Sequence, residues 1–137
     1  MNPITIEATV KGGAEKVWRY WTEPAHITVW NHASPDWECS RAENDLTVSG
    51  VFSATMAARD GSFSFDFAGT YTEVIPLKKL SYAFEDGRTV TVTFTNVSDT
   101  ETKVTEVFDP ETENTEEKQR EGWQAILNNF KQHVETT

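Results

Sequence analysis

The N-terminal part of the chain changes from a strand-like to a helix-like spacing of its apolar residues. Alternation of apolar and polar residues over 4–10 predicts a half-buried strand, which a glycine pair ends. Helical spacing then predicts a short helix with apolar positions at Ala14, Val17, Trp18 and Trp21. Pro24 cannot continue this helix but suits the first turn of a second one, which carries Ile27 and Trp30.

The middle of the chain is a series of alternating segments separated by turn residues, which predicts an antiparallel meander. The predicted strands cover residues 36–41, 46–59, 63–72, 80–85, 90–95 and 102–108. Asp60-Gly61 and Asp86-Gly87 are typical of tight hairpin turns. At roughly 3.3 Å per residue the strands over 46–59 and 63–72 would reach about 46 and about 33 Å, about 40 Å on average, so we expect the sheet to twist and curl.

The last part of the chain carries an apolar stripe at helical spacing. Its members are Trp123, Ile126, Leu127, Phe130 and Val134. The stripe predicts a helix over residues 115–134, about 30 Å long at 1.5 Å per residue. Asn114 with Glu117 three residues later predicts a capping box at its start, and Lys131 suits the negative end of its dipole.

This order of elements predicts an α+β fold, β-αα-β(6)-α, in which a curved antiparallel sheet is closed by the C-terminal helix. On the inner face we expect side chains from neighbouring strands, namely Phe52, Met56, Phe63, Phe65, Phe67 and Tyr71. Eight Phe, five Trp and three Tyr are a heavy load of rings for 137 residues. A sheet curled around one helix encloses more volume than one helical stripe fills, so the rings either fill the interior or line a ligand cavity.

Length and charge limit the classes of partner. A chain of 137 residues fits one domain, residues 1–137, whose core is large enough to fold without disulfides or a structural metal. It has 22 acidic and 12 basic residues, a formal net charge of −10. Such a charge repels phosphate backbones and anionic headgroups, so we expect neither nucleic acid nor a membrane as a partner.

The single cysteine and the N-terminus predict a cytoplasmic protein. Cys39 has no second cysteine to pair with, and we expect it to be a buried or pocket-wall residue rather than a reactive thiol. The first residues have neither a basic start nor an apolar run, so no secretion signal is predicted. No segment has the length of a membrane span.

The sequence lacks the common catalytic and metal-binding motifs. It contains no HExxH, no paired cysteines, no GxSxG and no phosphate-cradling glycine loop. His26, His32 and His133 lie far apart along the chain without partners at metal-ligand spacing, so we expect separate surface or loop histidines. Neither a metal nor a cofactor is therefore predicted.

Three segments resemble a known family. They are AEKVWRYWTEPAHITVW at residues 14–30, DGSFSFDFAGTYTEVIP at 60–76 and GWQAILNNFKQHVE at 122–135. Their spacing of Trp, Gly and Pro resembles the START-like (SRPBCC) helix-grip superfamily. Within it the chain is most similar to bacterial proteins related to the C-terminal domain of the activator of the heat-shock-protein-90 ATPase. The resemblance covers nearly the whole chain.

This resemblance implies a helix-grip fold with a cavity between the curved sheet and the C-terminal helix. Relatives in the wider superfamily bind lipids, polyketides, plant hormones or flavonoid-like aromatics. It therefore implies non-catalytic binding or sensing of a small hydrophobic or aromatic ligand. Two alternatives stay open. A chaperone-associated interaction domain of the stress response would show an exposed apolar patch, and an aromatase or cyclase would need a proton-transfer group in the cavity.

The candidate ligand-binding residues are those that the predicted register and the resemblance place around this cavity. They are Trp30, Trp37, Phe52, Met56, Phe65, Phe67, Tyr71, Phe84, Glu106, Trp123 and Leu127. Asn31 and His32 are expected to border its mouth.

Glu106 is the one charged residue that the register turns inward. Lys103 should face solvent, which puts Val104, Glu106 and Phe108 on the inner face. Similar sequences favour an apolar residue at this position. A carboxylate there needs a partner or a raised pKa. Alternatively, the strand is bulged or shifted in register and Glu106 is solvated.

Overall fold

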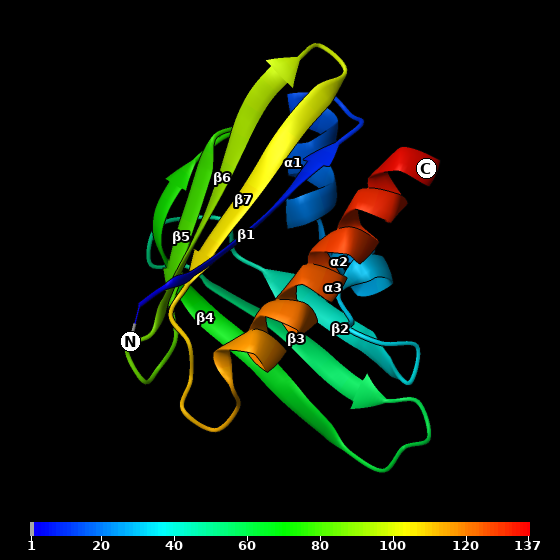
Figure 1. The fold of residues 1–137 in the computed structure, drawn as a ribbon, viewed down its shortest axis with the longest axis vertical. Coiled ribbons are helices and arrows are strands. Elements are labelled where there is room, and N and C mark those ends of the chain that lie inside the picture. The colour runs from blue at the N-terminus through cyan, green and yellow to red at the C-terminus, as the bar shows by residue number, and fades with distance from the viewer. Residues whose placement is uncertain (1) are drawn as a thin grey trace.

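A curved antiparallel sheet wraps around one long helix in the computed structural model, which describes residues 2–137 (Figure 1). The elements are β1 (Ile4–Val10), α1 (Ala14–Thr22), α2 (Pro24–Trp30), β2 (Trp37–Asn44), β3 (Val51–Ala58), β4 (Ser64–Ile75), β5 (Lys79–Ala83), β6 (Thr89–Ser98), β7 (Glu101–Phe108) and α3 (Glu116–Thr136). Neighbouring strands are antiparallel in the order β1-β7-β6-β5-β4-β3-β2. The predicted α+β class and the order β-αα-β(6)-α are confirmed.

The alternation along β7 places Glu106 on the inner face of the sheet. β7 pairs with β1 without any slip, and Ile6 lies opposite Glu106. On the other side, the register between β6 and β7 shifts only between Asn96 and Ser98, at the far end of the pair. The register predicted from Lys103 is therefore confirmed, and the alternative of a bulge that solvates Glu106 is wrong.

The strand predicted over residues 46–59 is shorter than expected. β3 begins at Val51, because the residues before it form a tight turn. Thr47 Oγ1 donates to the Asp45 carboxylate at 3.1 Å, Thr47 N donates to the Asp45 carbonyl at 2.8 Å, and Ser49 has a φ of 72°. Such local bonds compete with strand pairing and override the alternation. The eight residues of β3 thus span about 26 Å rather than about 46 Å, whereas the twelve of β4 reach about 40 Å.

Both predicted hairpin turns are confirmed. Gly61, between β3 and β4, has a φ of 79°, and Gly87, between β5 and β6, has a φ of 92°. These values lie in the left-handed region, where glycine carries no steric penalty.

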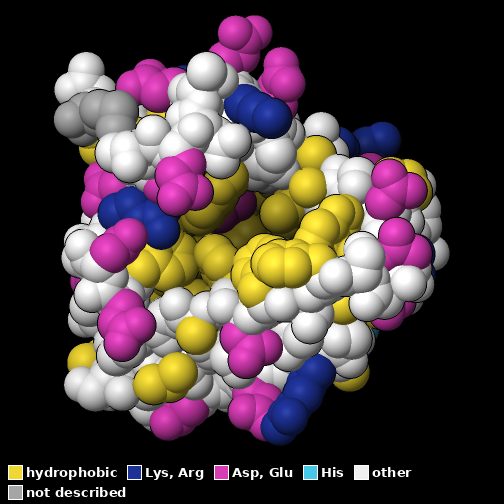
Figure 2. All heavy atoms as spheres, turned by 90° about the horizontal axis from the view of Figure 1, so that it is seen from below, with side chains coloured by type: hydrophobic (Ala, Val, Ile, Leu, Met, Phe, Trp, Pro, Cys, Tyr) yellow, Lys and Arg dark blue, Asp and Glu magenta, His cyan; other side chains and the backbone are white. Residues whose placement is uncertain are grey.

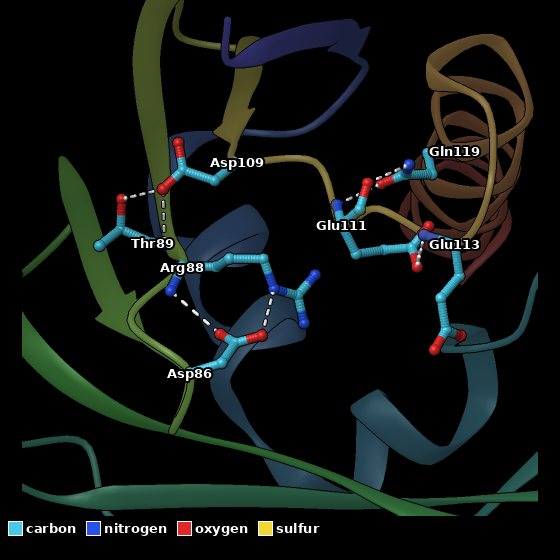
Figure 3. Close-up of polar contacts among 7 residues, drawn as sticks. All are labelled: Asp86, Arg88, Thr89, Asp109, Glu111, Glu113 and Gln119. Atoms are coloured by element: carbon cyan, nitrogen blue, oxygen red, sulfur yellow. Dashed lines mark hydrogen bonds and ion pairs between the residues drawn. The ribbon is translucent and has the colours of Figure 1, made fainter. Parts of the chain in front are cut away.

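The helix α3 is capped one residue later than predicted. Thr115 is its N-cap, and its side chain accepts a hydrogen bond from Lys118 N at 3.1 Å. The predicted capping box at Asn114 is therefore wrong. Asn114 N donates instead to the Glu111 carboxylate at 2.8 Å. Gln119 Nε2 donates to the Glu111 carbonyl at 3.0 Å (Figure 3). These bonds fix the loop before α3 and thereby the position at which the helix begins.

A second polar contact ties the end of β7 to the neighbouring strand. The Asp109 carboxylate accepts from Thr89 N at 2.9 Å and from Thr89 Oγ1 at 3.1 Å (Figure 3). The turn before Thr89 is closed by Arg88 Nε, which donates to Asp86 at 2.7 Å. The C-terminal end of β7, the strand that carries Glu106, is thus fixed before the chain continues into α3.

The helices each turn an apolar side toward the sheet. Phe130 and Val134 of α3 and Val17 of α1 are fully buried, and Trp18 of α1 meets Phe94 of β6 with ring centroids 5.3 Å apart.

Within residues 2–137, no helix has the length and apolarity that crossing a membrane would require.

Candidate ligand-binding site

A cavity lies between the inner face of the sheet and the helices α2 and α3. Its volume is about 200 Å³, several times the roughly 30 Å³ that one water molecule takes up in the liquid. Figure 2 shows the hollow, lined mainly by hydrophobic side chains, with an acidic side chain in its depth. The wall consists of Trp21, Ile27, Trp30, Asn31, Glu43, Asn44, Phe52, Ser53, Ala54, Met56, Phe65, Phe67, Tyr71, Leu80, Tyr82, Glu106, Trp123 and Ile126. The predicted internal cavity is confirmed.

Strands β3 and β4 form a large part of this wall, and a glycine shapes it. Phe52 of β3 lies opposite Gly69 of β4. A Cβ atom on Gly69 would stand 2.8 Å from the Phe52 ring, closer than real Cβ contacts, so the ring would have to shift. The missing side chain lets Phe52 pack edge-on against Tyr82, with ring centroids 4.6 Å apart.

Two tryptophans on the helical side are held in fixed orientations. Trp123 of α3 stacks on Phe108, with ring centroids 3.9 Å apart and planes inclined by 8°. Trp30 of α2 donates from Nε1 to the Tyr20 carbonyl at 2.9 Å. Since packing and hydrogen bonds hold both rings, this side of the cavity is formed before any ligand arrives.

Most of the predicted ligand-binding residues lie in the wall. They are Trp30, Phe52, Met56, Phe65, Phe67, Tyr71, Glu106 and Trp123, and Asn31 borders the cavity as expected. Phe65 is 45% exposed, so it stands at the opening. Ligand contact by these residues stays a prediction.

Three of the predicted residues lie outside the wall. Leu127 is fully buried in the core, because α3 turns Trp123 and Ile126 toward the cavity instead. Phe84 follows the end of β5 and packs edge-on against Phe67, with ring centroids 5.0 Å apart.

Trp37, the third, starts the edge strand β2. It contacts Phe65 and Phe63, with ring centroids 6.0 and 6.2 Å away. Phe63, expected on the inner face, is 59% exposed. His32, expected at the mouth, is also absent from the wall.

Several residues of the wall were not predicted from the sequence, among them Tyr82, Leu80, Asn44 and Glu43. Tyr82 and Leu80 alternate along one strand, so the same rule that found Phe67 would have found them. Asn44 and Glu43 lie at the end of β2, two residues or more past the predicted end of that strand, where alternation gave no signal.

Glu106 is buried without a partner. Its side chain is 4% exposed, and burial raises the pKa of its carboxyl from the ordinary 4.5 to about 8. No hydrogen bond and no cation within the described residues offsets this burial. The neutral acid is therefore the dominant form of Glu106 at pH 7 in the unliganded protein.

Two tyrosines contribute phenol groups to the wall. Tyr71 donates to Asn44 Oδ1 at 2.7 Å, and Asn44 Nδ2 donates to the Thr22 carbonyl at 2.7 Å. Burial raises the pKa of Tyr71 to about 12. Burial, and then the nearby charges of Glu106 and Tyr71, raise the pKa of Tyr82 well above 10. Both phenols stay neutral over the physiological range.

A known protein family matches most of the chain. The model of the family "Activator of Hsp90 ATPase homolog 1-like protein" matches residues 12–135. The chain belongs to this family. A search of curated proteins finds no match.

Solved structures agree with the assignment. The chain is similar to an AHSA1-like protein from Aeromonas hydrophila, with 46% identity, a TM-score of 0.91 and coverage of 98% of this chain and 92% of that one. For a protein of Cytophaga hutchinsonii the values are 51%, 0.85, 99% and 94%. A protein of Chromobacterium violaceum shares the fold at 22% identity, with a TM-score of 0.85 and coverage of 98% and 99%. The predicted START-like resemblance is confirmed.

The histidines of this AHSA1-like chain are not all separate, as the sequence had suggested. His26 of α2 and His133 of α3 meet, with Nδ1 of His26 3.0 Å from Nε2 of His133. Tyr20 stacks on His26 with ring centroids 3.8 Å apart, and Glu23 lies 3.7 Å from His26 Nε2. Within the described part of the chain, no group of three or more His, Cys, Asp or Glu could hold a metal ion.

We expect this histidine contact to weaken in acid. Burial, then the charges of His26 and Lys16, lower the pKa of His133. The unfolded chain therefore binds the proton first, so the stabilisation is present above about pH 6.5 and lost below it. His133→Gln keeps a hydrogen-bonding group but does not titrate. Between pH 7 and pH 5 the free energy of unfolding of wild type should therefore fall relative to that of His133→Gln. A difference that is constant with pH would contradict the contact.

Cys39 is buried, as predicted, but it is not part of the cavity wall. Its side chain is 3% exposed and its Sγ donates to the Arg41 carbonyl at 3.5 Å. Burial raises the pKa of the thiol. The thiol form is the unreactive one, so Cys39 is a packing residue.

Proposed function

We propose that this AHSA1-like chain binds a small, mainly hydrophobic or aromatic ligand, lipid- or polyketide-like in character, in the cavity between sheet and α3. The observation that carries the proposal is the cavity itself, an apolar interior that the protein's own side chains leave unfilled. An empty apolar cavity forfeits packing contacts and destabilises a fold, so its presence in a well-packed protein favours a binding role. Binding in the cytoplasm, as the sequence predicts, is part of the proposal.

The size of the cavity limits the ligand. An apolar cavity of about 150 Å³ is large enough to bind benzene, and pockets for drug-sized molecules begin at about 300 Å³. The cavity here, at about 200 Å³, lies between these values. It suits a ligand with one or two rings, or a short branched chain, rather than a long lipid tail.

The test is a thermal-shift screen with small hydrophobic and aromatic compounds. A ligand that binds only the folded state stabilises it, by about 2.7 kcal/mol at a concentration one hundred times its Kd. Compounds that raise the Tm are then measured by titration calorimetry against wild type and Ala54→Leu. Ala54 is 3% exposed and lies in the wall, so leucine fills part of the cavity. We expect it to weaken binding at least about tenfold.

Ala57→Leu is the matched control. Ala57 lies on the same strand but outside the wall, so this variant should bind as wild type does. Equal affinity of all three proteins would show that the ligands bind elsewhere. No stabilising compound in the screen would contradict the proposal.

A chaperone-associated interaction domain is the second candidate. The rings of Phe63 and Phe65 are 59% and 45% exposed beside Trp37, and such neighbouring apolar groups favour a protein contact. Phe63→Ser would abolish binding to a protein partner and leave small-ligand binding in the cavity unchanged, since Phe63 is not in the wall. The third candidate function, that of an aromatase or cyclase, would convert the ligand into a product. Analysis of the compounds present after incubation with the protein would detect this product.

A further inference from the structure

The carboxyl group of Glu106 is the polar feature of the cavity that the fold does not explain. It is 4% exposed, it lies in the wall, and burial alone shifts its pKa. Its neighbours across the sheet, Ile6 on β1 and Val92 on β6, offer it no polar side chain. A buried carboxyl without a partner destabilises a protein, and an apolar residue of similar size would avoid that penalty. No hydrogen bond to a described residue occupies this carboxyl, so it is free to bind a ligand that enters the cavity.

Aromatic rings surround the space into which this carboxyl opens. Trp30 and Trp123 lie on the helical side, and Phe52, Phe67 and Tyr82 on the sheet side. The face of an aromatic ring carries a partial negative charge and attracts cations, most strongly when water is excluded. Several rings together with one carboxylate form the arrangement by which proteins bind ammonium groups.

The charge of the wall points the same way. It contains two acidic residues, Glu43 and Glu106, and none of its residues is a lysine, arginine or histidine. The side chain of Glu43 is 61% exposed at the opening and pairs with Arg41. A fatty acid or other organic anion would meet no cation in this wall, in a protein with a net charge of −10. The electrostatics thus disfavour anions and favour cations.

We propose that the cavity selects a ligand with a protonated amine on an aromatic or apolar body, and that Glu106 is the counter-ion of this amine. The inference rests on the proposed function, since it names the chemical class of ligand for the same cavity. The rings hold the apolar body and the carboxylate fixes the charged end.

The proposal requires Glu106 to lose its proton when the amine binds. Burial raises its pKa to about 8, so at pH 7 the ammonium group must displace this proton to solvent. Affinity for an amine should therefore rise with pH, by at most about tenfold per pH unit, up to about pH 8 and then level off, as long as the amine stays protonated. Tyr71 and Tyr82, the titratable groups that face the cavity from β4 and β5, stay neutral over this range.

Three indole compounds of matched shape provide the test, because they differ mainly in the charge of the side chain. Tryptamine carries an ammonium group, tryptophol a neutral hydroxyl and indolepropionic acid a carboxylate. Titration calorimetry at pH 9, where Glu106 is ionised, should show tryptamine binding about tenfold more tightly than tryptophol. Indolepropionic acid should bind most weakly. The affinity for tryptamine should fall between pH 9 and pH 6, and that for tryptophol should not.

Glu106→Gln and a surface control separate the role of this carboxylate from the net charge. In Glu106→Gln, tryptamine should lose about tenfold in affinity and all of its pH dependence, whereas tryptophol should change less than about twofold. Glu121→Gln, the same change at an exposed position of α3, should behave as wild type.

Two outcomes would overturn the inference. If tryptophol binds as tightly as tryptamine, or if Glu106→Gln keeps the preference, the cavity binds apolar ligands without selecting an amine, and the proposed function stands. If none of the three compounds binds, the inference is wrong. The thermal-shift screen then decides separately whether the cavity binds any ligand.

Discussion

Replacing Glu106 with glutamine should raise the free energy of unfolding by up to about 3 kcal/mol at pH 7. The pKa of this carboxyl is about 8 in the folded protein, against 4.5 ordinarily. Between these two values the unfolded chain releases the proton while the folded protein keeps it. The contribution of the protonated carboxyl to the free energy of unfolding is thus complete below about pH 4.5 and is lost as the pH rises through about 8. Glutamine has nearly the same shape and does not titrate, so it removes this loss.

Urea denaturation of wild type and Glu106→Gln at pH 4, 7 and 9 measures the effect. The two proteins should be almost equally stable at pH 4, and the variant should gain with each step upward, most at pH 9. Glu121→Gln, at an exposed site, controls for the removal of one negative charge. Parallel pH profiles for Glu106→Gln and wild type would mean that the carboxyl is hydrated and has an ordinary pKa.

The fold could be predicted because alternation and helical spacing determine which face of each strand and helix is apolar. The elements then pack with these apolar faces toward one another. The prediction for β7 needed only Lys103 on the outside, and the regular pairing of β7 with β1 bears it out. The prediction failed where local hydrogen bonds compete with the pattern. Thr47 bonds to Asp45 before β3, and Thr115 caps α3 in place of Asn114.

The candidate site was predicted less completely, since alternation gives the face of a residue but not its depth. Phe67 and Phe84 both follow the rule, yet Phe84 packs edge-on against Phe67 and is not part of the cavity wall. Leu127 and Trp123 share one helical stripe, but only Trp123 stands at the cavity. The contact between His26 and His133 joins positions 107 residues apart. No local pattern encodes such a contact, which depends on how α2 and α3 cross.

Phe130→Ala should lower the free energy of unfolding by about 4 kcal/mol. The ring is fully buried and meets Trp21 and Trp30 edge-on, with ring centroids 4.8 and 5.0 Å away. Alanine would remove its apolar surface and leave a void that two large, rigid rings cannot close. Trp21 and Trp30 also form part of the cavity wall, so their loss of support should weaken ligand binding as well.

Phe63→Ala is the matched control, because the same change is made to a ring that is 59% exposed. It should cost less than about 1 kcal/mol, as most surface substitutions do. Denaturation of both variants, followed by tryptophan fluorescence, gives the comparison directly. Equal losses would mean that Phe130 does not support the tryptophans. A large loss for Phe130→Ala with unchanged ligand affinity would mean that the core and the cavity wall are independent. The expected result, in which stability and affinity fall together, follows from one ring serving both.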